Sequence, residues 1–239
     1  RLHLAELNLR AGVRARQASA YDSAMQYLEV AAELLPGDPW AEIPELMWAL
    51  AVETQQCAYF TGRTEEADRW IEVLLEHARS NLERSDILAT RTRQYATLGR
   101  MEDSIRASIR GLALLGMEFP DQPRDEEIAE EQRRVIANLG DRRIADLVDA
   151  PLVEDPATLT AMRLLMEIFA AAFLSGSGKL FPYLVLKAVN LSLRHGNCPE
   201  SAFTYAAYGM LLCGELDQPA IGYQYGKVGL AINERLDDI

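Results

Sequence analysis

A spacing of small, large and small residues recurs along the chain and constrains its fold more than any other feature. In the first copy, Leu28 follows Ala24 by four residues, Ala31 follows Leu28 by three, and Pro36 stands after the expected end of the helix. Small side chains let two helices approach closely, and apolar residues at this period form a packing stripe. Each helix pair of this kind leaves an apolar flank that only a neighbouring pair can cover, so the pattern predicts stacked helix pairs.

Weaker copies of the spacing follow. The second copy has Gly62 at the turn and then Ala67, Ile71 and Leu74 on the following helix. The third copy has Tyr95 on its first helix, Gly99 at the turn, and Ser104, Leu112 and Leu115 on its second helix. A late copy has Gly214 at the turn, followed by the small residues Ala220 and Gly222. The steps between copies exceed the roughly 34 residues of a tetratricopeptide unit, which the pattern otherwise resembles. The expected fold is all-α, a superhelical stack of tetratricopeptide-like antiparallel helix pairs.

Strand patterns are nearly absent. The sequence has no sustained alternation of β-branched and polar residues and no Asn-Gly or Asp-Gly hairpin dipeptide. A helical stripe is clear instead at Leu159, Met162, Met166, Phe169 and Phe173, whose steps of three and four place them on one packing face.

Composition divides the chain into three predicted segments. Residues 1–116 hold the first helix pairs, residues 117–155 form an acidic joint with helices near 124–138 and 142–148, and residues 156–239 continue the stack. Asp155-Pro156 reads as an N-cap followed by a proline in the first helical turn. Residue 1 is Arg within a helical pattern, so we expect a piece of a longer protein.

Charge and cysteine usage exclude several classes of function. The formal net charge is −12, and nucleic-acid binding requires clustered Lys and Arg to neutralise phosphates. Cys57, Cys198 and Cys213 lack CxxC spacing and an even count, which disfavours disulfides and zinc and fits a cytoplasmic location. The most apolar stretch, 169–193, is interrupted, so no membrane insertion is expected.

We find no convincing catalytic, cofactor or metal motif. Ser175-Gly176-Ser177-Gly178-Lys179 suggests a phosphate-binding loop, but Phe173 stands where that motif needs its first glycine and Leu180 where it needs Ser or Thr. His3, His77 and His195 lack partners at metal-ligand spacing. The acidic residues are interpreted as a solvated helix face, with a partner-binding patch as the alternative: Asp125, Glu126, Glu127, Glu130 and Glu131.

The first helices of each pair line the concave face of such a stack, where a peptide would bind. Phasing the copies places four residues near that face: Arg16, Gln56, Tyr59 and Arg93. The alternative is that these side chains only pack or remain exposed without a ligand. The three tryptophans, Trp40, Trp48 and Trp70, are interpreted as packing anchors rather than a binding cage.

A further set of residues resembles a known family. The similar segments are Phe181 to Lys187, Asn190 to Leu193, His195 to Asn197, Ser201 to Tyr205, Tyr208-Gly209, Arg100 to Leu115, Asp155-Pro156 and Gly222-Tyr223. They resemble the helical region of large bacterial multi-domain signalling kinases, in which a serine/threonine kinase-like domain and a STAND-class predicted ATPase precede helical repeats, a GAF sensor and a histidine kinase. None of that family's kinase or ATPase motifs falls inside this chain, so the resemblance implies no catalytic residue here.

Two hypotheses of function follow. In the first, the chain is a non-catalytic interaction and relay segment of a signalling ATPase/kinase, with other domains of the same parent chain as partners. In the second, it is a free-standing scaffold that binds a protein or peptide of another chain. A helical enzyme would need convergent titratable groups, which the sequence does not bring together.

Overall fold

The protein is all-α. The computed structural model describes residues 1–120, 122–174 and 178–236, and in these ranges twelve α-helices and one 3-10 helix occur. The described residues contain no strand, only an isolated bridge between Leu152 and Asn197. This confirms the predicted fold class, whereas the tetratricopeptide-like superhelical stacking stays a prediction.

Contacts divide the chain into two compact units, Arg1–Ile87 and Leu88–Ile239, which we call the N-terminal and C-terminal units. The division falls inside one helix, α6 (Asn81–Thr97). The boundaries predicted near residues 116 and 155 are therefore not where contacts divide the chain. Residues 117–155 belong by their contacts to the C-terminal unit, and the division into three segments stays a prediction.

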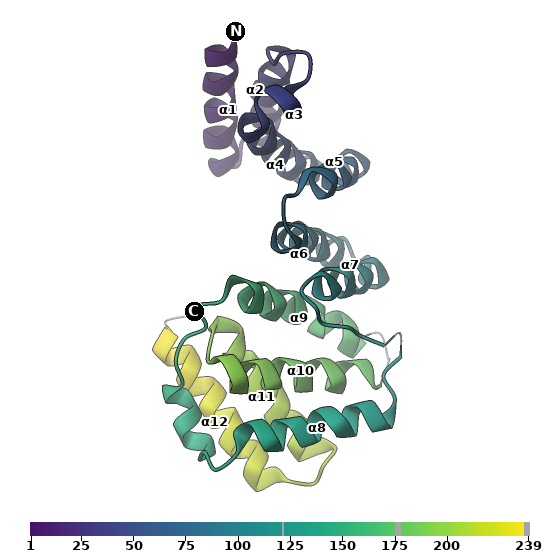
Figure 1. Cartoon of the computed structure of the whole chain (residues 1–239), viewed down its shortest axis with the longest axis vertical. Helices are drawn as coiled ribbons and strands as arrows, with labels where there is room; N and C mark the ends of the chain where they lie inside the picture. The colour runs from purple at the N-terminus through teal and green to yellow at the C-terminus, as the bar shows by residue number, and fades with distance from the viewer. Residues whose placement is uncertain (121, 175–177, 237–239) are drawn as a thin grey trace. The chain divides into compact units, whose positions relative to one another are not determined.

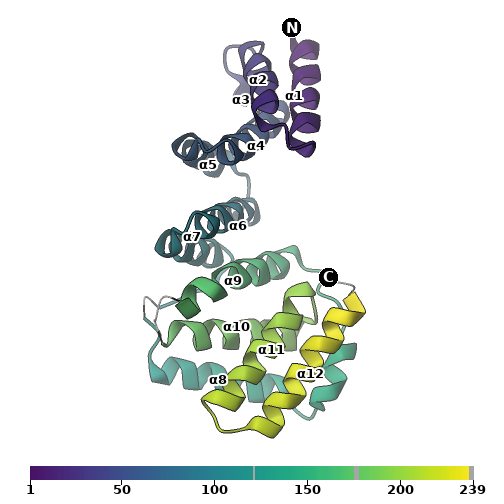
Figure 2. The same cartoon turned by 180° about the vertical axis from the view of Figure 1, so that it is seen from behind.

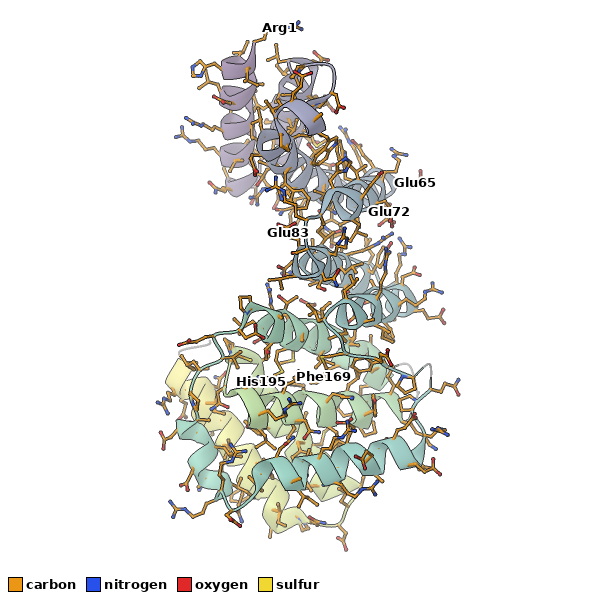
Figure 3. All side chains as sticks on the ribbon, in the orientation of Figure 1. Arg1, Glu65, Glu72, Glu83, Phe169 and His195 are labelled. Atoms are coloured by element: carbon orange, nitrogen blue, oxygen red, sulfur yellow. The ribbon has the colours of Figure 1, made fainter. Side chains whose placement is uncertain are left out.

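The N-terminal unit is built from successive helix pairs. Helix α1 (Leu2–Gln17) packs on α2 (Tyr21–Glu33), and α4 (Pro44–Phe60) packs on α5 (Thr64–His77) and also contacts α1 and α2 (Figure 1). The short α3 (Pro39–Glu42) lies against α4. The apolar stripe of α2 explains this packing, because Ala24, Leu28 and Ala31 are all buried. Glu65 and Glu72 lie on the exposed outer side of α5 (Figure 3).

The turns within four helix pairs share one geometry. In each, a residue with positive φ precedes a buried small residue by five positions: Ser19 and Ala24, Gly62 and Ala67, Gly99 and Ser104, Asp217 and Gly222. In all four, the amide of the small residue donates to the carbonyl four residues earlier. The small residue is buried because it lies in the first turn of the second helix of each pair, where that helix packs against the first helix. Gly214, which was predicted at the late turn, is the last residue of α11, and the residue of that turn with positive φ is Asp217.

The C-terminal unit surrounds a buried helix. It comprises α7 (Met101–Leu114), α8 (Asp125–Leu139), the 3-10 helix η1 (Ile144–Asp149), α9 (Pro156–Leu174), α10 (Leu180–His195), α11 (Pro199–Gly214) and α12 (Pro219–Leu236). Helix α10 contacts α8, α9 and α11, and Figure 2 shows α11 and α12 lying side by side in front of it. Its side chains are mostly buried, as its near-continuous apolar sequence requires.

Specific contacts join the helices of this unit. Ser104 Oγ donates to Thr92 O at 3.0 Å and joins α7 to α6, while Ser108 Oγ donates to Leu164 O at 2.9 Å and joins α7 to α9. The Phe169 ring, labelled in Figure 3, lies 6.0 Å from the Phe181 ring. These contacts hold α9 between α7 and α10.

Several predicted local features are present. The acidic helix appears as α8, and the short helix near 142–148 appears as η1. Asp155 caps α9, because its Oδ2 accepts from Thr158 N at 2.9 Å and from Thr158 Oγ1 at 2.6 Å, and these hydrogen bonds lower the Asp155 pKa. In the predicted α9 stripe, Met162 and Phe169 are buried but Phe173 is 61% exposed.

Helix α9 meets the length and composition criteria for a membrane-spanning helix, among the described residues the single helix that does so. However, 56% of its most apolar window is buried inside the structure. Its apolar residues are needed to fill the centre of the C-terminal unit.

Candidate functional site

Arg16, the first predicted concave-face residue, is held in an ion pair. Its Nε lies 2.5 Å from Glu53 Oε2 and a terminal nitrogen lies 3.2 Å from Oε1, so the guanidinium bridges α1 and α4 with two hydrogen bonds. The bond to Glu53 raises the Arg16 pKa above its usual value. Both side chains are largely buried, with exposed fractions of 23% and 14%. The pair joins α4 to α1.

Gln56 and Tyr59 lie one turn apart on α4, and both are half-buried. Tyr59 packs edge-to-face against Phe60, whose ring stacks on Tyr21 with centroids 4.5 Å apart. Phe60 remains 50% exposed. Helix α4 therefore presents an aromatic cluster beside the predicted residues, and the sequence analysis missed Phe60.

Arg93 lies in the other compact unit. Its Nε is 3.3 Å from Glu167 Oε1 across α6 and α9, and burial raises the Glu167 pKa. Arg16, Gln56 and Tyr59 thus lie on two helices that contact each other, α1 and α4, whereas Arg93 takes part in a separate contact. A role in peptide binding for these four residues stays a prediction.

The predicted solvated acidic face of α8 needs a correction at one residue. Glu131 is 4% exposed, and its carboxylate lies 2.8 Å from Lys187 Nζ and 2.8 Å from Arg134. Asn190 Nδ2 donates to Glu131 Oε2 at 2.9 Å. A buried carboxylate requires such partners, so Glu131 fixes α8 on α10 instead of facing water. The available signal was its spacing from Ile128 and Val135, three residues before and four residues after it, which places Glu131 on the apolar face of α8.

A groove lies between α8 and α11, with α10 as its floor. It encloses a cavity of about 380 Å³. The apolar walls and floor come from six residues: Ile128, Ala129, Pro182, Leu186, Leu211 and Leu216. Because α8 contributes positions that recur every three or four residues, one face of that helix forms a continuous wall. No sequence pattern indicates this groove, because residues of three separate helices build it.

Polar groups of the groove are mostly satisfied within the protein. Gln132 Nε2 donates to Tyr208 OH at 2.7 Å, and burial raises the Tyr208 pKa. At the rim, Lys179 Nζ lies 2.8 Å from Asp125 Oδ2. Arg133 pairs with Glu130 at 2.8 Å, and that hydrogen bond lowers the Glu130 pKa. Glu215 is exposed at the same rim and forms no ion pair within the described part of the chain.

A second surface feature is an apolar face on the last helix pair. Phe203 and Met210 of α11 are each 50% exposed, and Tyr223 and Leu230 of α12 are 69% and 61% exposed. Each pair is seven residues apart and therefore lies on one helix face. We call these four residues the α11–α12 patch. Exposed apolar clusters of this kind mark interaction surfaces more often than isolated apolar residues do.

The tryptophans and the candidate metal and phosphate sites of the sequence complete the set of candidate residues. Trp40 stacks on His77 with centroids 3.8 Å apart and packs edge-to-face on Trp48, in agreement with their interpretation as packing anchors. Within the described residues, no group of three or more His, Cys, Asp or Glu could hold a metal. Of the rejected phosphate-loop motif, residues 175–179, the first three lie outside the described residues.

Comparison with known proteins finds a similarity to part of a histidine kinase. It is 22% identical over 265 residues to hybrid signal transduction histidine kinase G of Dictyostelium discoideum, an alignment that covers 100% of this chain and 8% of that protein. The chain thus spans less than a tenth of this relative. No protein-family model matches the chain, and no solved structure matches it. The repeat type, the bacterial origin, the ATPase module and the serine/threonine kinase-like domain stay predictions, while the chain is similar to a segment of a signalling histidine kinase.

Proposed function

We propose that this chain is a non-catalytic interaction segment of a signal-transduction kinase and connects other domains of the same protein. The observation that carries the proposal is the similarity of the whole chain to a small part of a hybrid histidine kinase. A segment that makes up 8% of so large a relative fits an accessory role better than a complete enzyme.

The surface supports an interaction role. The α11–α12 patch presents four large apolar side chains, and the N-terminal unit presents Phe60. In the N-terminal unit, α4 covers the apolar flank of the α1–α2 pair, which is how stacked helix pairs satisfy one another. We infer that tetratricopeptide-like stacking continues beyond the described helices through contact with a partner domain.

The titratable groups support a non-catalytic role. The buried thiols Cys57 and Cys198 each have a pKa raised to about 11 by burial, which is opposite to the activation of a nucleophile. The buried Glu131 is held by Lys187, Arg134 and Asn190, an arrangement that stabilises a helix contact.

Isothermal titration calorimetry tests the proposal. The chain is titrated with the purified remaining domains of its own full-length protein, with and without ATP. We expect binding that changes with nucleotide, because a connecting segment must distinguish the states of its neighbours. Binding that is absent in both states would contradict the proposal and favour the second hypothesis, a scaffold for a peptide of another chain.

Matched variants identify the surface used. Phe203→Ser with Leu230→Ser replaces two of the four exposed apolar side chains of the α11–α12 patch, one on each helix. Ile136→Ser serves as the control, because Ile136 is 64% exposed on α8 and lies outside the patch. We expect the double variant to weaken domain binding at least tenfold and the control to leave it unchanged.

A further inference from the structure

We propose that the groove between α8, α10 and α11 binds a segment of another protein that inserts one large apolar side chain beside a Lys or Arg. The inference goes beyond the proposed function, whose partners are domains of the same protein, and adds a second partner from another chain together with its chemistry. It concerns a different surface from the α11–α12 patch, so the two can be tested separately.

The shape and lining of the groove determine the apolar part of the ligand. The cavity of about 380 Å³ lies within the range of small binding pockets, roughly 300–1,000 Å³. Leu186 on the floor is 3% exposed and Leu211 on the wall is 6% exposed, so these side chains are held by the core beneath them. Leu216 at the rim is 44% exposed. A large apolar side chain placed here would contact all three.

The floor of the groove is rigidly held. Leu186 precedes Lys187, whose ammonium pairs with the buried Glu131 of α8 and lies 5.3 Å from the centre of the Tyr183 ring. On the other side, the Gln132–Tyr208 hydrogen bond links α8 to α11. These contacts fix the spacing of the three helices without a ligand, and a preformed site loses less entropy on binding.

The charges at the rim of the groove determine the sign of the charge that the ligand should carry. Asp125 is neutralised by Lys179, and Arg133 is neutralised by Glu130. In the described residues this leaves Glu215 as the rim charge that forms no ion pair. Glu215 also follows the last residue of α11, where the negative end of the helix dipole attracts cations. The groove therefore complements a positive charge next to the apolar side chain.

Three capped dipeptides provide the probes, namely acetyl-Phe-Lys-amide, acetyl-Phe-Gln-amide and acetyl-Phe-Glu-amide. Each is titrated into the full chain while amide ¹⁵N–¹H correlation spectra are recorded. We expect the lysine probe to shift amides lining the groove, including Ile128, Leu211 and Leu216. It should bind about fivefold more tightly than the glutamine probe, the effect of one exposed ion pair, and the glutamate probe should bind most weakly.

Three variants make the test specific. Glu215→Gln should abolish the preference for lysine over glutamine. Ala129→Trp fills the groove from an exposed wall position and should abolish binding of every probe, whereas Ala137→Trp, on an exposed part of α8 away from the groove, should leave binding unchanged. Spectra of each variant show that it is folded.

Either of two results would overturn the inference. The first is the absence of shifts at the groove amides with the lysine probe. The second is binding of the glutamine or glutamate probe that is equal to or tighter than that of the lysine probe. If the groove fails in this way while the chain still binds its neighbouring domains in calorimetry, the proposed function survives and only the groove is excluded.

Discussion

The three cysteines differ in their surroundings, and this predicts different reactivity. Cys57 and Cys198 are buried and have a pKa of about 11, while Cys213 is exposed. The thiolate is the reactive form, and at pH 8 only about 0.1% of a thiol with such a pKa is ionised. We expect a thiol-reactive dye to label Cys213 within minutes and the other two at least tenfold more slowly, as measured by mass spectrometry of digested protein. Equal labelling of all three in the native chain would contradict this, and labelling in urea is the control.

The turn at Ser19 stores backbone strain. Ser19 has φ of 59°, whereas the equivalent positions in the next two pairs are Gly62 and Gly99. A non-glycine residue at positive φ destabilises the folded state by about 1 kcal/mol or more. Glycine avoids this strain, but its greater conformational entropy in the unfolded chain lowers the free energy of unfolding by about 0.5–1 kcal/mol. We therefore expect Ser19→Gly to be neutral or to stabilise the N-terminal unit by up to about 1 kcal/mol.

The matched opposite change is Gly62→Ala, which introduces a side chain at φ of 77° with no atom within 4 Å of the new Cβ. It should destabilise the unit by about 1 kcal/mol through backbone strain alone. Urea unfolding followed by tryptophan fluorescence measures both variants, and a loss of stability in Ser19→Gly would contradict the account.

At the scale of helices, α11 and α12 approach closely because glycines face each other. A Cβ built on Gly209 would lie 2.6 Å from Gly222 O, which is backbone and can move only if the helices separate. Gly209→Ala should therefore destabilise the C-terminal unit by about 1–3 kcal/mol. Gly226→Ala is the control, since nothing lies within 4 Å of its new Cβ and alanine favours a helix by up to about 1 kcal/mol. Urea unfolding followed by circular dichroism distinguishes them.

The contact between α8 and α10 depends on a buried ion pair. Lys187→Met leaves Glu131 buried with Arg134 and Asn190 as its remaining partners. Breaking a buried pair costs about 3–5 kcal/mol, and the remaining partners should reduce this to about 2–3 kcal/mol. The double variant Glu131→Leu with Lys187→Met removes both charges and should recover most of the loss in urea unfolding. A double variant no more stable than Lys187→Met would show that the pair itself is not the cause.

At the scale of the whole molecule, two compact units predict two unfolding transitions. Trp40, Trp48 and Trp70 all lie in the N-terminal unit, so tryptophan fluorescence reports that unit while circular dichroism reports both. We expect the two probes to give different urea midpoints, and Gly209→Ala to shift the dichroism curve but not the fluorescence curve. Superimposable curves for wild type and variant would show that the chain unfolds as one unit.

Much of the helical organisation was predictable from sequence, because it depends on local chemistry. Ala24, Ala67 and Ser104 were recognised as small positions, and each is buried five residues after a turn residue with positive φ. Asp155 is predictable as an N-cap, because an Asp directly before a proline in the first turn of a helix accepts hydrogen bonds from the free backbone amides there. Ser19 was missed because serine seldom adopts positive φ.

The candidate sites were less predictable, because they depend on contacts between distant segments. Arg16 was predicted to face a ligand, and its bond to Glu53 becomes visible only once α4 packs on α1. Glu131 reads as one acid in a run of acids, and only the position of Lys187 and Asn190 on α10 shows why it is buried.

Helical period and turn residues are local properties, so the sequence is enough to predict a series of helices with small residues at their contacts and without strand patterns. The division into compact units, the burial of Glu131, and the groove of α8, α10 and α11 with Glu215 at its rim follow only from the folded structure. Those features arise from packing between residues far apart in the chain, and the periodicity of the sequence contains no information on such contacts.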